Sequence, residues 1–140
     1  VGASNELSNI NFTKIIFPIN QFVSKLITEQ AATAYLVRAL FDQGYRINSL
    51  KTQNKSKAAS FQVYLHTNKP VTKEIKQGLK NGQAVSKGVS LTKDLGNLPP
   101  NICTPTYLAN SAKKLAREYK MKATVLEQKQ IEKLKMGSFL

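Results

Sequence analysis

Side chains that hold metal ions or act as nucleophiles are scarce in this sequence. It contains one histidine and one cysteine, and its only aspartates are Asp42 and Asp94, while the six glutamates are scattered along the chain. A dinuclear metal site needs several carboxylates that converge on ions roughly 3.5–4 Å apart. Neither phosphate-loop motif, G-x-G-x-x-G or G-x-x-x-x-G-K-[ST], occurs. This inventory excludes a metal site built by these residues alone and argues against independent catalysis.

Surface exposure and packing explain the single histidine and the single cysteine better than metal binding or catalysis does. His66 ends a predicted half-buried strand on the side opposite its apolar residues, and it has no second ligand nearby, which favours a surface role. Cys103 precedes a predicted helix cap and has no neighbouring histidine to activate it, which favours packing over nucleophilic catalysis. One cysteine cannot form an internal disulfide, in agreement with a reducing compartment.

Long apolar runs are also missing. None approaches the roughly 20 residues of a membrane span, and the first ten residues lack the basic start and apolar stretch of a signal peptide. We therefore expect a soluble, cytoplasmic protein with no membrane partner. Because residue 1 is valine and the chain stops on apolar residues after Gly137, we also expect a piece of a longer protein.

Acidic residues are outnumbered by basic ones, and the formal net charge is +13. Residues 46–93 hold ten Lys or Arg and one acid, Glu74. The positive electrostatic field of such a chain attracts nucleic acid, anionic lipid or an acidic partner. At 100° per residue, four lysines share one face of a predicted helix and are the candidate nucleic-acid-binding residues: Lys73, Lys76, Lys80 and Lys87. The alternative is an ordinary solvated surface.

Hydrophobic periodicity predicts alternating strands and helices in the first half of the chain. Residues 10–17 are β-branched and aromatic, which predicts a buried strand that closes at Pro18. Helical spacing predicts a helix from about residue 20 to residue 41, with Gly44 as its stop. An exposed, mobile basic loop over residues 49–60 then leads into a half-buried strand over residues 61–67.

A long helix follows, capped by Thr72 and running to about Leu95. Its predicted packed face holds Ile75, Gly78, Gly82, Val85 and Val89. Each glycine inside a helix costs about 1 kcal/mol relative to alanine, so the pair predicts a close backbone approach by a neighbouring element. The alternative is a weak helix that breaks at Gly82.

The segment NLPPNICTP predicts a stiff joint between two helices. Pro99 pushes Leu98 out of the helical region and Pro100 does the same to Pro99, so the long helix must end. Thr104 and Pro105 fit the cap and the first position of a new helix. Its predicted inner face holds Leu108, Ala112, Leu115, Ala116 and Tyr119. A strand over residues 122–127 and a short helix ending at Gly137 complete an order of elements that predicts an α/β fold.

The stretch TKDLGNLPPNICTPTYLANSAKKLAREY, followed by VLEQKQIEKLKMGSFL, resembles the start of the catalytic domain of the cytosolic leucyl aminopeptidase family. The resemblance is long and specific over residues 93–140, and NLPPNICTP is its most distinctive part. The preceding residues, 10–92, resemble the later half of the family's amino-terminal macro-like domain and its linking helix. The resemblance therefore implies three parts: residues 1–69 from the macro-like α/β domain, 70–98 as a linker helix, and 99–140 as the truncated first helix-strand-helix of the α/β catalytic domain.

The same resemblance implies a function for the longer protein. Members of this family are metalloexopeptidases that release N-terminal amino acids from peptides with two divalent ions, manganese or zinc, and they form hexamers from two trimers. Their metal ligands and catalytic lysine and arginine would lie beyond Leu140, so we assign no catalytic or metal-binding residue here and predict that this chain alone is inactive. Some bacterial members that resemble this sequence also bind DNA. The alternative is thus a basic nucleic-acid-binding or oligomer-building module without catalysis.

Overall fold

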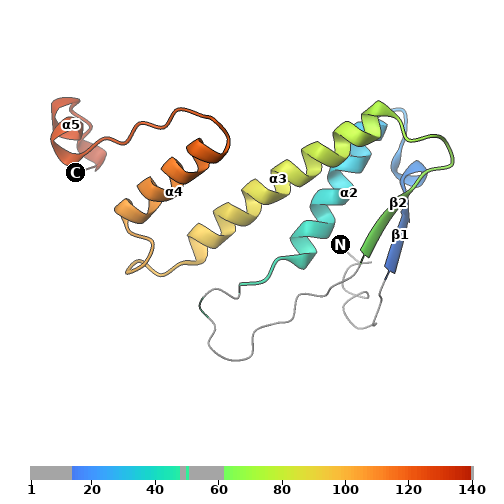
Figure 1. The fold of residues 1–140 in the computed structure, drawn as a ribbon, viewed down its shortest axis with the longest axis horizontal. Helices are drawn as coiled ribbons and strands as arrows, with labels where there is room; N and C mark the ends of the chain where they lie inside the picture. Colours follow the sequence, from blue (N-terminus) through green and yellow to red (C-terminus); the bar gives the residue numbers. More distant parts are fainter. Residues whose placement is uncertain (1–13, 48–49, 51–61, 140) are drawn as a thin grey trace. The chain divides into compact units, whose positions relative to one another are not determined.

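The computed structural model describes residues 14–47, 50 and 62–139 and forms two compact units, Val1–Gly96 and Asn97–Leu140. The first unit holds the sheet and the second holds the last residues of the chain (Figure 1). The described residues form four α-helices and a two-stranded parallel sheet, so the fold is mixed α/β, as predicted. Among them, no helix has both the length and the apolar character needed to cross a membrane.

The sheet of the first unit pairs β1 (Lys14–Pro18) with β2 (Gln62–His66) in parallel. Exposed and half-buried residues alternate in β2, as predicted. The prediction of a buried first strand is wrong, because Ile16 is 66% exposed and faces the open side of the sheet beside Tyr64. Positions 10–13 of that predicted strand, and all of the predicted basic loop except Leu50, lie outside the described residues.

The first long helix, α2, spans Glu29–Gly44, so its predicted start at residue 20 is wrong and its predicted stop at Gly44 is confirmed. A short 3-10 helix, η1 (Ile19–Phe22), and a turn replace the predicted first two turns. In that turn the Ser24 hydroxyl accepts hydrogen bonds from two backbone N–H groups that a helix would direct elsewhere. The helix instead begins after Thr28, whose hydroxyl accepts from the Ala31 N–H at 3.2 Å.

The second long helix, α3, spans Lys73–Asn97 without interruption, so the alternative of a break at Gly82 is wrong. The predicted cap is confirmed, because the Thr72 hydroxyl accepts from the Ile75 N–H at 3.2 Å. The packed face differs from the prediction at one position. Val85 is exposed and Ser86 is buried, because the packed face continues four residues after Gly82 rather than three.

The two glycines allow α2 and α3 to lie in close contact, which confirms the predicted backbone approach (Figure 1). A β-carbon added at Gly78 would collide with the Gln30 carbonyl oxygen and lie 2.8 Å from Cβ of Thr33. One added at Gly82 would lie 2.8 Å from the Ala34 carbonyl oxygen. Successive positions on α3 meet successive positions on α2, so the helices run parallel.

Beside this contact lies the core of the first unit. Its fully or nearly fully buried apolar side chains are Ile19, Ala32, Val37 and Ile75. Two buried hydroxyls, Thr33 and Ser86, each donate to the carbonyl four residues earlier in their own helix at 2.7 Å. The small polar side chains therefore keep the helices close without an unpaired buried hydroxyl.

At the start of the second unit, the predicted end of α3 before the proline pair and the predicted start of the next helix are confirmed. α3 ends at Asn97, and the carbonyl of Pro99 accepts hydrogen bonds from the N–H groups of Ile102 and Cys103, each at 2.9 Å. The Thr104 hydroxyl then caps α4 (Pro105–Glu118). The two prolines thus end one helix and fold the chain into a tight turn that starts the next.

The predicted inner face of α4 is mostly uncovered. Only Ala116 is buried, whereas Leu108 is 45% exposed and Tyr119 is 52% exposed. Within the described residues of this unit, no element packs over these side chains closely enough to bury them. This face of α4 has the apolar pattern that is typical of a helix packed in a core. In the described part of this unit, however, the face is largely uncovered.

Two predictions near the end of the chain are wrong. Residues 122–127 form no strand, because no described strand of this unit lies beside them to accept their hydrogen bonds. The short helix α5 (Gln128–Lys133) ends before Gly137, which instead begins the 3-10 helix η2 (Gly137–Phe139). The left-handed residue after α5 is Lys135, with φ of 56°, rather than the glycine.

Candidate functional site

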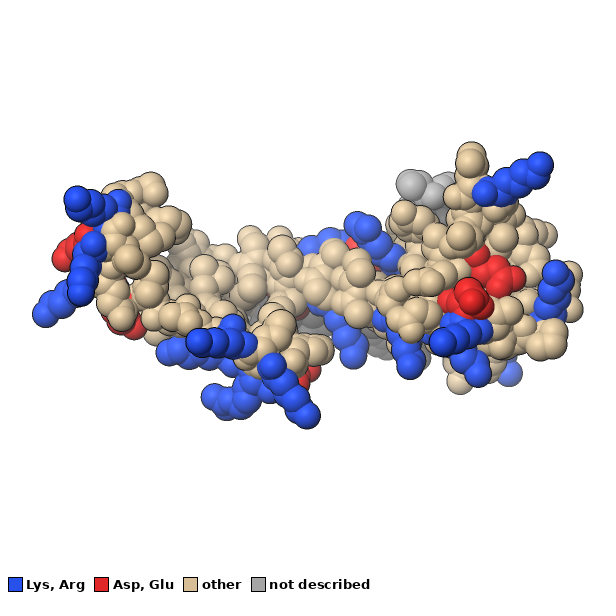
Figure 2. All heavy atoms as spheres, turned by 90° about the horizontal axis from the view of Figure 1, so that it is seen from above, with Lys and Arg blue, Asp and Glu red and all other residues tan. Residues whose placement is uncertain are grey.

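The four candidate lysines, Lys73, Lys76, Lys80 and Lys87, are all exposed on α3. At 1.5 Å per residue they extend over about 21 Å of helix. None forms an ion pair with a described residue. On the face drawn in Figure 2, lysine and arginine side chains lie singly and in small groups, with fewer acidic side chains among them. This arrangement can meet several phosphate groups of a nucleic acid backbone, but it forms no pocket that selects one ligand.

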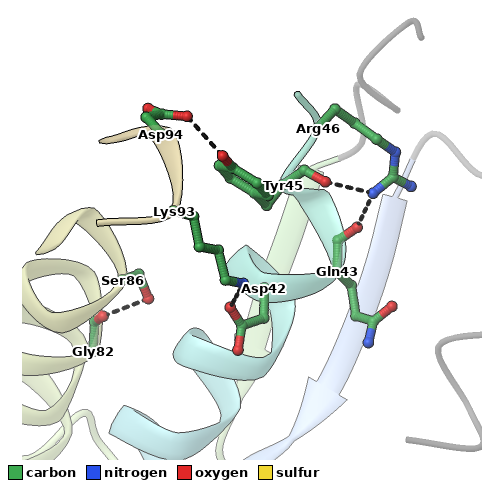
Figure 3. A network of polar contacts seen from close by, with 8 residues as sticks. All are labelled: Asp42, Gln43, Tyr45, Arg46, Gly82, Ser86, Lys93 and Asp94. Atoms are coloured by element: carbon green, nitrogen blue, oxygen red, sulfur yellow. Dashed lines mark hydrogen bonds and ion pairs between the residues drawn. The ribbon is translucent and has the colours of Figure 1, made fainter. Parts of the chain in front are cut away.

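The carboxyl ends of α2 and α3 are joined by a polar cluster that we call the C-terminal clasp: Asp42, Tyr45, Lys93 and Asp94 (Figure 3). Nζ of Lys93 lies 2.6 Å from Oδ1 of Asp42 and 5.1 Å from the centre of the Tyr45 ring. The Tyr45 hydroxyl donates to Oδ1 of Asp94 at 2.8 Å. The paired side chains of Lys93 and Asp42 are 38% and 40% exposed, so the ion pair alone contributes about 0–1 kcal/mol.

The amino ends of the same helices are joined by a second contact, the N-terminal clasp, formed by Glu29 and Thr72. The Thr72 hydroxyl donates to Oε2 of Glu29 at 2.8 Å while it accepts the capping hydrogen bond of α3. Parallel helices align their dipoles, so the carboxylate lies where both helices carry partial positive charge. The Lys93 ammonium and the Arg46 guanidinium, which donates to the Gln43 carbonyl at 2.6 Å, lie where α2 carries partial negative charge.

The described residues do not fit a metal centre. No group of three or more His, Cys, Asp or Glu side chains among them is placed to hold an ion. Both aspartates of the sequence belong to the C-terminal clasp. His66 is exposed at the end of β2, and Cys103 is half-buried in the turn before α4. Neither side chain belongs to a group of possible metal ligands among the described residues.

An open hollow of about 460 Å³ lies beside the contact of α2 and α3. Its lining is Thr28, Gln30, Ala31, Ala34, Tyr35 and Asn81. Its hydroxyls, Thr28 and Tyr35, have no carboxylate, imidazole, amine or thiol beside them in the lining that could activate them as nucleophiles.

Neither clasp is predicted by the sequence patterns. Their partners are 43 to 51 residues apart along the chain, and local periodicity contains no information about such pairs. The one available signal was that the only two aspartates flank the ends of the predicted helices.

Comparison with known proteins extends the resemblance over most of the chain. Residues 90–140 match the profile described as "Cytosol aminopeptidase family, catalytic domain". A protein of Paraburkholderia phymatum named "Probable cytosol aminopeptidase" is 40% identical over 136 residues, which cover 96% of this chain and 26% of that protein. Proteins with the same name from Paraburkholderia xenovorans and Pseudomonas fluorescens are 39% and 36% identical, over 98% and 99% of this chain and 26% and 32% of their own lengths. The chain spans between about a quarter and a third of the length of these relatives.

Proposed function

Because the chain belongs to the cytosol aminopeptidase family, we propose that it is part of a metal-dependent leucyl aminopeptidase that releases N-terminal amino acids from peptides. The observation that carries this proposal is the match of residues 90–140 to the family's catalytic domain. The proposal for the longer parent protein includes two divalent ions, manganese or zinc, a cytoplasmic location and a hexameric assembly.

We assign three roles along the chain. Residues 1–69 belong to the later half of a macro-like amino-terminal domain, residues 70–98 are the linker helix, and residues 99–140 begin the catalytic domain. The parallel β1–α2–β2 arrangement followed by one uninterrupted helix supports the first two roles. The boundary between the compact units, at Gly96 and Asn97, supports the position of the third.

The metal ions of the parent protein are not held by the residues described here, which lack a suitable group of ligands. Hydrolysis at a dinuclear centre needs carboxylates around the ions and a cation for the developing oxyanion. We therefore place these groups outside residues 1–140. The contribution of this chain is structural: it ends the linker helix, turns the chain at Pro99 and begins the first helix of the catalytic domain.

The open face of α4 supports this assignment. Leu108 and Tyr119 lie on it, and Ala116 is the one buried residue among positions 97–139 of the second unit. A unit with so little buried surface cannot stabilise itself. Burial of one large apolar side chain contributes about 1.5–3 kcal/mol, so we propose that further parts of the catalytic domain cover this face in the parent protein.

Hydrolysis of leucine para-nitroanilide tests the proposal. We expect no hydrolysis by the 140-residue chain with added manganese, zinc or cobalt, and chelator-sensitive hydrolysis by the longer parent protein. Intact mass of the sample and the codons after Leu140 establish which protein is being assayed. Chelator-sensitive activity in a homogeneous 140-residue sample would contradict the absence of a site in this chain, and an inactive, verified parent would contradict the assignment as an aminopeptidase.

A second function, nucleic-acid binding, is favoured by the four exposed lysines of α3. If Lys73, Lys76, Lys80 and Lys87 contact phosphates, changing all four to glutamine weakens DNA binding and flattens the log-log salt dependence by about 0.9 per lost contact. The control changes an equal number of exposed lysines in the second unit: Lys113, Lys114, Lys129 and Lys133. Equal affinity and slope in the two variants would leave the four lysines of α3 as solvated surface.

A further inference from the structure

The last turns of α3 are held in a different way from the rest of the helix. Up to Ser86, which is 3% exposed, small side chains bury the helix against α2. Beyond Ser86 no described residue of α3 is fully buried, and the C-terminal clasp provides an ion pair, a ring contact and a hydrogen bond to α2 (Figure 3). Helix ends fray where such contacts are lacking. The clasp therefore supplies contacts of the kind that keep a helix end ordered.

The position of the clasp in the chain gives it a further role. The catalytic-domain match begins at residue 90, inside α3, and the first unit ends at Gly96. Lys93 and Asp94 thus lie in the catalytic-domain match while they bind Asp42 and Tyr45 of α2. The proline turn starts only a few residues later.

We propose that Lys93 is a positioning residue of the parent peptidase. Its ammonium pairs with Asp42 and covers the ring of Tyr45, whose hydroxyl in turn holds Asp94. These contacts hold the last turns of α3, the part of the first unit that directly precedes the catalytic segment. The proposal rests on the proposed function, because positioning is defined relative to that catalysis.

The clasp matters for the placement of the end of α3 rather than for the free energy of unfolding. One cation is shared by a carboxylate and an aromatic face, and a neighbouring carboxylate accepts from the same tyrosine, so the side chains constrain one another. Loss of the charge at position 93 removes the ion pair with Asp42 and the cation–ring contact with Tyr45, and no fully buried side chain is altered. A small displacement at a remote point is sufficient to lower catalysis, since a 1 Å misplacement can reduce a rate by about 10²-fold.

The experiment uses the full-length parent protein with Lys93→Met, the conservative variant Lys93→Arg, and Tyr45→Phe, which keeps the ring but removes its hydrogen bond to Asp94. The control is Lys69→Met, which removes one exposed charge from the same unit outside the clasp. Steady-state kinetics with leucine para-nitroanilide give kcat and KM separately. Hydrogen exchange compares residues 88–96 with residues 73–86.

For Lys93→Met we expect a fall in kcat of about tenfold, within the range for remote misplacement, with KM within about twofold and faster exchange confined to residues 88–96. Lys93→Arg and Lys69→Met should retain wild-type kcat, and Tyr45→Phe should give a smaller fall than Lys93→Met. An active parent in which Lys93→Met leaves kcat unchanged overturns the positioning role alone. An inactive wild-type parent overturns the proposed function and the positioning role together, while unchanged exchange at residues 88–96 shows that Lys93 does not hold the helix end.

Discussion

Gly82 allows a direct test of how α3 packs against α2. In Gly82→Ala the new β-carbon would lie 2.8 Å from the carbonyl oxygen of Ala34 and 2.8 Å from Cβ of Val37. One of these atoms belongs to the backbone and the other is the first carbon of a β-branched side chain, so neither can rotate away. The substitution therefore forces the two helices apart.

The size of the effect follows from two opposing contributions. Over-packing of a tight contact costs about 1–3 kcal/mol, whereas alanine inside a helix is favoured over glycine by about 1 kcal/mol. Their sum predicts that Gly82→Ala lowers the free energy of unfolding by about 0–2 kcal/mol. In the matched control, Gly88→Ala, the new β-carbon meets nothing within 4 Å, so only the favourable helix contribution of about 1 kcal/mol remains.

Urea unfolding of the 140-residue chain, followed by far-ultraviolet circular dichroism, measures the free energy of unfolding of both variants. The difference between them cancels the intrinsic preference of alanine for helix and should be about 1–3 kcal/mol, with Gly82→Ala the less stable. Equal stabilisation by the two substitutions would refute the argument, since it would mean that the space beside Gly82 is open in solution.

Two further predictions concern the second unit. Replacing Pro99 and Pro100 together with alanine should let α3 run on past Asn97 and misplace α4, lowering the melting temperature or the oligomeric mass of the parent protein; unchanged values of both would count against a stiff joint. Lys120 follows α4 with φ of 54°, while the Met121 N–H donates to the Ala116 carbonyl at 2.8 Å, so Lys120→Gly should stabilise the parent by about 0.5–1 kcal/mol in urea unfolding. Arg117→Gly, inside the same helix, should destabilise it by about 1 kcal/mol, and a change of the same sign in both variants would contradict this account.

Features fixed by local chemistry were predictable from the sequence. The capping threonines Thr72 and Thr104 and the stop at the proline pair depend on neighbouring residues only, and all three were predicted correctly. The glycine pair was also informative, because its cost in a helix has no local explanation. It predicted that another element comes close, although not which one.

Two kinds of feature were not predictable from the sequence: those decided by competition between local hydrogen bonds, and those decided by contacts between residues far apart in the chain. Residues 20–28 have helical spacing, yet Ser24 and Thr28 offer the backbone other hydrogen bonds and delay α2. Residues 122–127 have the composition of a strand, but strand structure requires a partner. The clasps join residues far apart in sequence, so no periodicity within one segment indicates them.

The parallel packing of α2 and α3 also affects how the protein is made. The contacts at the two ends of the pair close loops of 43, 49 and 51 residues, and non-local closures of this kind slow folding. During synthesis, α2 leaves the ribosome long before α3, whose glycines cover a stripe of α2 formed by Thr33, Ala34 and Val37. The first unit can be completed only after α3 has emerged, by which time the proline turn and α4 are already being translated. Until then, the exposed stripe of α2 is a place where a chaperone can bind or where nascent chains can aggregate.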